Sequence, residues 1–593
     1  MTLSAIALHD RLKLTRQACE ELGVSGFIIP RGDEFLGEYV SEASERLAWL
    51  TGFTGSAGLA AVLPNVASVF SDGRYTVQME EQVLHDVWER HHIISEPLSK
   101  WLEQNASGLK IGYDPKLVSQ SMLKSWRAKN VELVPLTQNP IDMAWKDRPL
   151  ETKNAVVKHS IEFSGESSAS KRKRLAELLE KNDQDAVIFA DCTSVAWLFN
   201  LRGSDVPLTP IAHGYALLHA DAKAELFIEK ERVERDLLDA FRDEVTVYPP
   251  HHLEERLLKL SEKTVRIDSS TTPVWFEAFL KMNKARIIDE VDPCTLPKAI
   301  KNVVEQEGSR RAHHYDGVAL ARFLHSLTTS GVGQRETDLV ERLDYFRRQS
   351  EFYKEQSFDA ISAVGPNGAY PHYRAEIGKD RSLTPNSVYL IDSGGQYPFG
   401  TTDITRTVWI GPENPPKSIK EAFTRVLKGN IALSCARFPL GTTGHRLDAL
   451  ARLPLWEVGL DFDHGTGHGI GSYLSVHEGP QSISSVFRPT PLQEGMIVSN
   501  EPGYYQAGDY GIRIENLMLV KQAQNPKSTK HFLEFEVLTY TPIDRELIDL
   551  SLLNEDEVSW INTYHSNTFS KIAPEVEPEV QEWLKKVCEP LSE

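Results

Sequence analysis

The chain has 593 residues, of which 41% are hydrophobic and 25% charged, and its formal net charge is −19 at pH 7. This length leaves room for two to four domains, and the composition is typical of a soluble globular protein. The negative charge argues against nucleic acid as a partner. No apolar run reaches the length of about 18 residues that a membrane-spanning helix needs, so we expect no membrane insertion.

The cysteines predict a reducing compartment. The chain has five of them, an odd number, and no two are spaced as CxxC. Scattered thiols of this kind indicate neither a disulfide framework nor a zinc ribbon. We therefore expect a cytoplasmic protein.

The first half of the chain contains a repeated pattern. Residues 11–30 read as an amphipathic helix followed by an apolar strand, and residues 171–190 repeat that order. Each copy then reaches a Trp-Leu segment that ends in Gly-Ser, at residues 49–56 and 197–204. Another strand follows in each copy, and the shared order predicts two related α/β domains in tandem.

Three domains are predicted, with boundaries at residues 1–143, 144–297 and 298–593. The third begins with two helices, expected over 298–326 and 336–346. Beyond them, strands are expected to alternate with Gly/Pro/Asn turns up to about residue 540, and an acidic tail from residue 546 reads as helical. The fold class is thus α/β, with an α+β third domain.

Five potential metal ligands stand beside apolar or glycine-rich segments of the third domain. They are Asp392, Asp403, His468, Glu501 and Glu515. Four carboxylates in such surroundings would repel one another and resist burial unless a cation held them. The donor set, oxygen with one imidazole, predicts a divalent metal site, most simply a pair of ions.

The spacing of the carboxylates predicts how they meet. Asp392 and Asp403 lie eleven residues apart and bracket a Gly/Pro turn, and Glu501 and Glu515 bracket a second turn in the same way. Any one of these acids alone is better explained as a cap or a solvated turn residue. Two hairpins facing each other, with His468 between them, would form a metal site with internal pseudo-twofold symmetry.

Other motifs separate the remaining alternatives. His464 and His468 are four residues apart, but the glycines around them predict a loop or strand rather than a zinc-binding helix. His372 and His477, taken from the sequence alone, are as compatible with a structural as with a functional role. HExxH, GxSxG and GxxxxGK[ST] motifs are absent from the sequence, so zincin, serine hydrolase and P-loop classes have no support.

These residues resemble a known family. The order Asp, eleven residues on Asp, then His, Glu and Glu is similar to the metal site of the pita-bread metallopeptidases, which include methionine aminopeptidase, prolidase and aminopeptidase P. The tandem repeat before the third domain resembles the three-domain cytosolic type of Xaa-Pro aminopeptidase. The resemblance implies two creatinase-like N-terminal α/β domains followed by a pita-bread catalytic domain.

The resemblance implies a role for each ligand. Asp392 would chelate one metal, Asp403 and Glu515 would bridge two, and His468 and Glu501 would complete the coordination of the second ion. Two Mn²⁺ ions are the implied cofactor, and an oxygen-rich site with one imidazole suits them. A water or hydroxide between the ions would be the nucleophile.

Further roles follow from the same resemblance. Glu501 would move the proton of the attacking water to the departing proline nitrogen. His372 and His477 would hold the scissile carbonyl and stabilise the oxyanion. His464 would shape the pocket, and Arg513 would support the carboxylates.

The implied substrates are small peptides with proline in the second position, and the implied assembly is a homodimer. Tyr370 is a weak candidate for the slot that receives the proline ring. Prolidase is the alternative within the enzymes, although it usually lacks the second N-terminal domain. A non-catalytic pita-bread binding module is the alternative outside them, although such modules typically lose ligands.

Overall fold

The computed structural model describes residues 5–524 and 529–591. The outer limits of the first and third predicted domains, residues 1–4 and 592–593, lie outside these described residues. Among the helices within the described ranges, none combines the length and apolar character needed to cross a bilayer.

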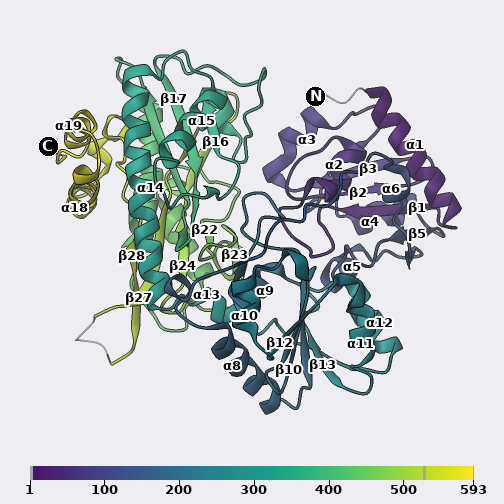
Figure 1. Cartoon of the computed structure of the whole chain (residues 1–593). Helices are drawn as coiled ribbons and strands as arrows, with labels where there is room; N and C mark the ends of the chain where they lie inside the picture. Colours follow the sequence, from purple (N-terminus) through teal and green to yellow (C-terminus); the bar gives the residue numbers. More distant parts are fainter. Residues whose placement is uncertain (1–4, 525–528, 592–593) are drawn as a thin grey trace. The chain divides into compact units, whose positions relative to one another are not determined.

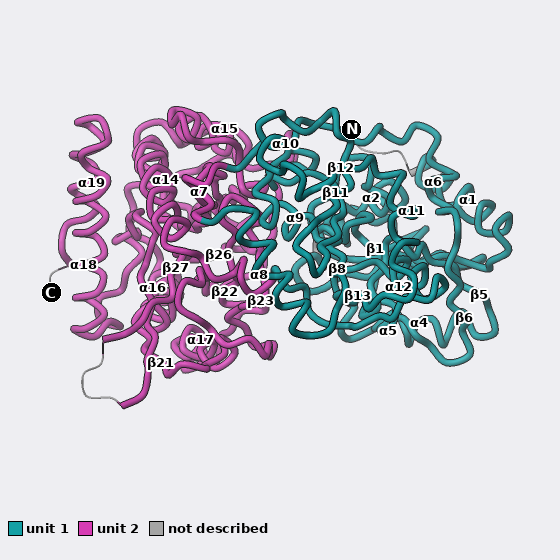
Figure 2. The backbone as a smooth tube through the Cα atoms, turned by 60° about the horizontal axis from the view of Figure 1, so that its bottom comes forward, with its two compact units in different colours: residues 1–159, 166–294 teal, residues 160–165, 295–593 magenta. Residues whose placement is uncertain are grey.

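The chain forms two compact units (Figure 2). Unit 1 comprises residues 1–159 and 166–294, and unit 2 comprises residues 160–165 and 295–593. Unit 1 contains two six-stranded sheets, and the antiparallel sheets that carry the candidate metal ligands belong to unit 2.

The first sheet of unit 1 is mixed. Its strand order is β4 (Glu89–His92), β3 (Ala67–Ser71), β2 (Leu59–Val62), β1 (Gly26–Pro30), β5 (Lys110–Tyr113) and β6 (Glu132–Pro135). Strand β1 runs antiparallel to β2 and parallel to β5. Its apolar residues serve both faces: Phe27 and Ile29 join one core cluster, and Ile28 joins another. A sheet buried on both sides explains why β1 is a continuous apolar run.

The second sheet repeats the first. Its strand order is β12 (Val245–Tyr248), β11 (Ala224–Phe227), β10 (Tyr215–His219), β8 (Ala186–Phe189), β13 (Thr264–Ile267) and β14 (Arg286–Asp289). Strand β8 pairs antiparallel with β10 and parallel with β13, as β1 does with β2 and β5. Helix α8 (Ser168–Lys181) precedes β8 as α1 (Ala5–Glu21) precedes β1. The repeat predicted from the sequence is therefore confirmed.

Unit 2 is built on antiparallel strands. A three-stranded sheet has the order β16 (Ile361–Val364), β17 (Ser387–Ser393) and β20 (Ile404–Ile410). A six-stranded sheet has the order β21 (Phe438–Pro439), β28 (Phe532–Val537), β27 (Asn516–Gln522), β24 (Ile497–Asn500), β22 (Gly467–Gly469) and β23 (Glu478–Ile483). These curled antiparallel sheets carry the residues singled out in the sequence.

Two helices cover the three-stranded sheet. They are α14 (Val303–Ser330), the long helix of Figure 1, and α15 (Glu336–Arg347). Leu320 and Phe323 of α14 and Leu339 of α15 pack in one buried cluster with Tyr389 and Ile391 of β17. Both helices lie where the sequence predicted them, with α14 beginning and ending a few residues later than expected.

The expectation of strands and turns alone from residue 358 to 540 is wrong. Helices α16 (Lys417–Ser434) and α17 (Asp448–Trp456) lie within this region. Ile419, Phe423 and Val426 follow a helical spacing and share one buried cluster, whereas in a strand Val426 would face the side opposite to Ile419 and Phe423. The glycines and prolines of the region punctuate the strands around the two helices but do not prevent them.

The C-terminal segment is helical, as predicted. It forms α18 (Glu555–Ile572) and α19 (Pro578–Val587), which lie beside α14 in Figure 1. Tyr564 of α18 reaches Arg406 of β20, whose buried guanidinium Nη2 donates to the Tyr564 hydroxyl over 2.7 Å. Arg406 also donates to the backbone oxygens of Glu515 at 2.6 Å and Thr541 at 2.9 Å. The tail is thereby joined to the strands that carry the candidate ligands.

Candidate metal centre

Two hairpins supply the four carboxylates. Asp392 is the second-to-last residue of β17 and Asp403 directly precedes β20, and these strands pair antiparallel. Glu501 directly follows β24 and Glu515 directly precedes β27, which pair antiparallel in turn. Short strands close each hairpin: β18 (Gly395–Tyr397) and β19 (Gly400–Thr401) in the first, and β25 (Gly503–Gln506) and β26 (Tyr510–Arg513) in the second. Each carboxylate therefore lies at the same end of its strand pair.

The two hairpins are joined directly. The backbone nitrogen of Glu515 donates to the carbonyl of Thr405 over 3.1 Å, and the Thr405 hydroxyl donates to Glu515 Oε2 over 2.9 Å. The hydroxyl of Thr407, two residues further along β20, donates to the carbonyl of Arg513 over 2.9 Å. These bonds fix the carboxylates of one hairpin opposite those of the other.

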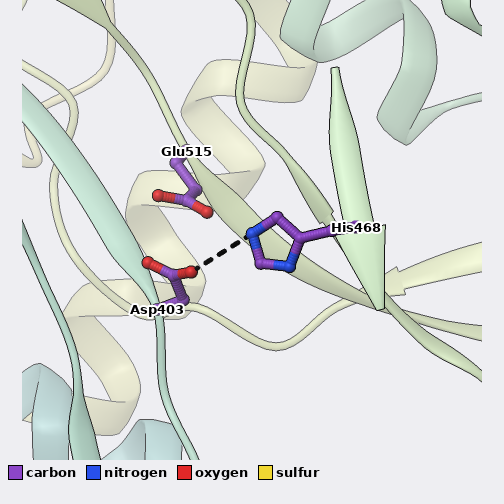
Figure 3. A group of neighbouring side chains, drawn as sticks. All are labelled: Asp403, His468 and Glu515. Carbon is purple, nitrogen blue, oxygen red and sulfur yellow. Dashed lines mark ion pairs between the residues drawn. The ribbon is translucent and has the colours of Figure 1, made fainter. Parts of the chain in front are cut away.

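His468 lies between the hairpins, on strand β22. One ligand atom each from Asp403, His468 and Glu515 lie within 4.8 Å of one another (Figure 3). His468 Nε2 is 3.5 Å from Asp403 Oδ2 and 3.4 Å from Glu501 Oε1. The Ser499 hydroxyl accepts from the His468 backbone nitrogen at 2.9 Å and donates to Glu501 at 3.1 Å, so it links the histidine to the fourth carboxylate.

Arg513 brings Asp392 into the cluster. Its Nη2 is 2.5 Å from Asp392 Oδ2 and 3.4 Å from the carbonyl oxygen of Pro371. Its Nε donates to the Thr405 hydroxyl at 3.1 Å, and its Nη1 donates to the Tyr505 hydroxyl at 2.6 Å. The guanidinium is 3% exposed. Charge-assisted bonds at a buried site of this kind hold a carboxylate in one orientation.

The carboxylates disfavour each other's charge. Asp392 is 7%, Asp403 4% and Glu515 1% exposed. Burial, followed by repulsion from neighbouring carboxylates, raises the pKa of Asp403 and of Glu515 well above the ordinary values. Burial likewise raises the pKa of Glu501 to about 7, against the attraction of Arg513. A protein that keeps these groups together without a cation would hold several of them protonated at neutral pH.

The donor set fits divalent metal ions. Asp392 Oδ1 and Glu515 Oε1 are buried, and neither has a hydrogen-bond partner among residues 5–524 and 529–591. Buried carboxylate oxygens are normally bonded, so two of them facing one cluster call for a ligand that accepts lone pairs. Carboxylate oxygens with one imidazole nitrogen suit a hard or borderline divalent cation.

Two further histidines predicted from the sequence lie in this site. The ring of His477 packs edge-on against His468, with 4.4 Å between the ring centroids. His464 Nε2 is 2.8 Å from the Tyr505 hydroxyl, and its Nδ1 is 2.8 Å from the carbonyl of Gly465. A consistent proton assignment has Arg513 donating to Tyr505, Tyr505 to His464, and His464 to the backbone.

Tyr370 and His372 belong to the segment that approaches Arg513. The carbonyl of Pro371, which lies between them, accepts the 3.4 Å bond from Arg513. Glu336, at the start of α15, also holds this segment, because its carboxylate accepts a hydrogen bond from the Tyr373 hydroxyl over 2.7 Å. The segment thus reaches the rim of the cluster at the backbone of Pro371.

Three residues of the site were not found from the sequence. They are Thr405, Ser499 and Tyr505. Thr405 could have been found, because strand alternation places it on the same face as Asp403. Ser499 carries the same signal, because it stands two residues before Glu501, whereas Tyr505 carries none, since its bond to His464 spans 41 residues and depends on how the chain folds.

The fold and the donor set define a metal-dependent hydrolase site held between two hairpins. Comparison with family models agrees along the chain. Residues 307–522 match metallopeptidase family M24, and residues 531–591 match the C-terminal region of these peptidases. Residues 11–143 and 147–305 each match the creatinase/prolidase N-terminal domain.

Known relatives extend this match to the whole chain. Aminopeptidase P1 of Lotus japonicus is 36% identical, covering 96% of this chain and 97% of its own. A probable Xaa-Pro aminopeptidase P of Laccaria bicolor is 37% identical, covering 100% and 95%. The chain therefore belongs to metallopeptidase family M24, with two creatinase/prolidase N-terminal domains.

Solved structures give the same result. The crystal structure of an X-prolyl aminopeptidase from Caenorhabditis elegans, described as a cytosolic enzyme with a di-nuclear active site, superimposes with a TM-score of 0.92 at 32% identity. It covers 98% of this chain and 100% of its own. A prolidase from Pyrococcus horikoshii gives a TM-score of 0.51 at 28% identity and covers 64% of this chain and 99% of its own.

Proposed function

We propose that this protein is a metal-dependent aminopeptidase that removes the N-terminal residue from peptides with proline in the second position. The observation that carries the proposal is the convergence of Asp403, His468 and Glu515 within 4.8 Å, beside Asp392 and Glu501. It occurs in a chain that aligns over nearly its full length with Xaa-Pro aminopeptidases.

Five side chains would hold two divalent ions, for which we propose Mn²⁺. Asp392 would chelate one ion, Asp403 and Glu515 would bridge the two, and His468 and Glu501 would complete the coordination of the second ion. The unpartnered oxygens of Asp392 and Glu515 support this assignment. When bound, the ions would supply Lewis-acid charge at the scissile carbonyl and lower the pKa of an attacking water.

Glu501 is the candidate proton carrier. Its side chain accepts a hydrogen bond from the Ser499 hydroxyl and lies beside His468. A carboxylate that lies beside the attacking water can act first as a general base and then as a general acid. Glu501 would take the proton from the attacking water and deliver it to the departing proline nitrogen.

The surrounding residues would position the substrate. His477, packed against His468, and His372 would hold the scissile carbonyl and stabilise the oxyanion. Arg513 fixes Asp392, and through Tyr505 it also orients His464, which would shape the substrate pocket. Because Arg513, Tyr505 and His464 are joined in one chain of hydrogen bonds, we propose that they position the site and do not react with the substrate themselves.

The preference for proline has a physical basis. A bond to proline is a tertiary amide without an N–H group, and the ring fixes the backbone angle φ. A site that requires that N–H group loses a contact, whereas a slot that accepts the ring gains selectivity. Tyr370, in the segment beside Arg513, is our candidate for contact with the ring.

The deciding experiment uses metal-stripped protein with and without added Mn²⁺. The probes are Ala-Pro-Ala, the dipeptide Ala-Pro and the proline-free control Ala-Ala-Ala, with products identified by mass. We expect Mn²⁺-dependent release of alanine from Ala-Pro-Ala only. Cleavage of Ala-Pro alone would assign the protein as a prolidase. No cleavage by protein that demonstrably binds metal would assign it as a binding module.

A single substitution tests the proton carrier. Glu501→Gln should lower kcat on Ala-Pro-Ala at least 100-fold, in line with the usual contribution of general acid–base catalysis and a lost ligand charge. Glu494→Gln, the same change at an exposed carboxylate just before β24, is the matched control and should leave kcat unchanged. Substantial activity in the Glu501 variant would show that another group moves the proton.

The prolidase alternative is less well supported, because the solved prolidase covers a smaller share of this chain than the solved aminopeptidase does. The Pyrococcus horikoshii prolidase spans nearly all of its own chain but only 64% of this one, whereas the Caenorhabditis elegans aminopeptidase spans 98%. The dipeptide arm of the experiment above separates the two enzymes.

Three further proposals concern the domains, the assembly and the location of the protein. We propose domain boundaries at residues 1–143, 144–297 and 298–593, which limited proteolysis with mass mapping tests. We propose a homodimer, which sedimentation at several concentrations tests. A cytoplasmic location agrees with the C. elegans enzyme and is tested by cell fractionation.

A further inference from the structure

The first hairpin narrows at residues 393–394 and 402, here called its neck. The neck sets the spacing of the candidate ligands Asp392 and Asp403. Ser393 follows Asp392 and Thr402 precedes Asp403, so these two neighbours stand where the arms of the hairpin come together. Gly394 lets them approach, because a Cβ at that position would lie 1.9 Å from the Thr402 carbonyl oxygen. A change in this neck would move both ligands.

A buried ion pair stands against this neck. Asp316 lies on α14 and Arg347 is the last residue of α15. Arg347 Nε is 2.7 Å from Asp316 Oδ1 and Nη2 is 3.1 Å from Oδ2, a two-pronged pairing. Asp316 is 2% and Arg347 1% exposed. Neither belongs to the cluster of candidate ligands.

The ion pair bonds to both arms of the hairpin. Arg347 Nη2 donates to the Ser393 hydroxyl over 3.0 Å, next to Asp392. The Thr402 hydroxyl donates to Asp316 Oδ2 over 3.0 Å, next to Asp403, and accepts from the backbone nitrogen of Gly395 at 2.9 Å. One ion pair therefore grips the residues adjoining two ligands.

A third bond closes the hairpin over the pair. The hydroxyl of Tyr397, on strand β18 of the hairpin, donates to Asp316 Oδ1 over 3.0 Å. On the other side of the neck, Ser357 donates through its hydroxyl to the Thr402 carbonyl at 2.9 Å and through its backbone nitrogen to the Gly394 carbonyl at 3.1 Å. The neck is therefore bonded on two sides, by the charged pair Asp316 and Arg347 on one and by the neutral Ser357 on the other.

Stability alone is a weak explanation for this arrangement. Removing two charges from water carries a desolvation penalty that their attraction often only offsets, and packed apolar residues of similar volume can be as stabilising. An apolar pair in the places of Asp316 and Arg347 could not form directed bonds to Ser393 and Thr402. What the ion pair adds is orientation of the two arms.

We propose that Asp316 and Arg347 are positioning residues that fix the separation of Asp392 and Asp403 and so tune how tightly the site binds its two metal ions. The inference rests on the proposed role of Asp392 and Asp403 as ligands. Removing a residue that orients a metal ligand commonly weakens metal binding 10- to 100-fold. The effect here would act on both ligands of one hairpin together.

The test pairs two substitutions at Thr402. Thr402→Val keeps the shape of the side chain but removes the hydroxyl that bonds to Asp316, and Thr402→Ser keeps the hydroxyl but removes the methyl group. Mn²⁺ binding to metal-stripped protein is measured by isothermal titration calorimetry. The electron paramagnetic resonance spectrum of the loaded protein reports whether the two ions remain coupled.

Asp316→Asn is the direct variant. We expect Thr402→Val and Asp316→Asn to weaken binding of at least one Mn²⁺ about 10- to 100-fold and to lower kcat with KM changed less than about twofold. Thr402→Ser should retain the wild-type metal affinity and spectrum. The control is Glu536→Gln, which alters another two-pronged pair of α14, with Arg310, whose Nε lies 2.7 Å and Nη2 2.9 Å from the carboxylate of Glu536 on β28.

The outcomes are distinct. If Asp316→Asn loses stability but keeps metal affinity, spectrum and kcat, as we expect for Glu536→Gln, then the ion pair serves the fold alone and the proposal is wrong. If Asp316→Asn does not fold, the two Thr402 variants decide, and equal behaviour of Val and Ser overturns the proposal. Asp403→Asn tests the underlying ligand assignment, because metal binding unaffected by that change would remove its basis separately.

Discussion

Stripping the metal from this protein should make its stability fall as the pH rises. The pKa of Glu501 is raised from 4.5 in an unfolded chain to about 7 in the metal-free fold, chiefly by burial. The folded state therefore holds the proton more tightly than the unfolded state. Glu501 contributes stability that is fully present below pH 4.5 and is lost as the pH rises through about 7.

The magnitude follows from the two pKa values. Their difference, from 4.5 to about 7, is about 2.5, and each pH unit corresponds to about 1.4 kcal/mol. Glu501 alone should then lower the free energy of unfolding by about 3 kcal/mol between pH 4.5 and 8. Asp403 and Glu515 titrate in the same direction, so their contributions increase the loss.

The assay must separate unit 2 from unit 1. Hydrogen-exchange mass spectrometry at increasing urea gives the local free energy of opening, and peptides from β24 and β27 report on the site. Metal-free Glu501→Gln, uncharged at every pH, should show a fall smaller by about 3 kcal/mol. Saturating Mn²⁺ should suppress the fall in the wild type, because the metal binds the deprotonated carboxylates. Equal slopes in the wild type and the Gln variant would refute this reasoning.

Three other substitutions have expected outcomes. Gly394→Ala places a Cβ 1.9 Å from a backbone oxygen, so calorimetry should find a destabilised unit 2, and the metal-loaded protein should lose most of its peptidase activity. Arg513→Met leaves Asp392 without its cation and should destabilise the metal-free protein by about 3–5 kcal/mol in urea, with partial recovery on adding Mn²⁺. Tyr564→Phe removes a hydroxyl bound to Arg406 and should lower the free energy of unfolding by about 1–3 kcal/mol, with kcat within about twofold of wild type.

Local sequence signals predicted the parts of the site that depend on neighbouring residues. Asp392 and Asp403 were expected to flank one hairpin because glycines and prolines lie between them, and they do flank the β17–β20 pair. His468 was expected on a loop or strand because glycines surround it, and it lies on strand β22. Both expectations needed only turn chemistry and strand alternation. The metal-binding roles themselves remain predictions.

Long-range contacts explain what the sequence left open. Arg513, Tyr505 and His464 form one chain of hydrogen bonds, although 41 residues separate Tyr505 from His464. Asp316 and Arg347 lie on separate helices, and their relation to the hairpin appears only when those helices pack on it. No local period or motif records such a meeting, because it is set by how the sheets and helices come together.

The bond between Arg406 and Tyr564 changes how the C-terminal helices should be regarded. Arg406 is sealed from water and bonded to neutral oxygens, one of them the backbone carbonyl of Glu515. A chain that ended before α18 would open this guanidinium to solvent and release the strand that presents Glu515. The tail is thus part of the fold of unit 2, because α18 contacts the guanidinium that holds the backbone of Glu515. Shortened or fused versions of the protein need α18 intact to keep that centre in shape.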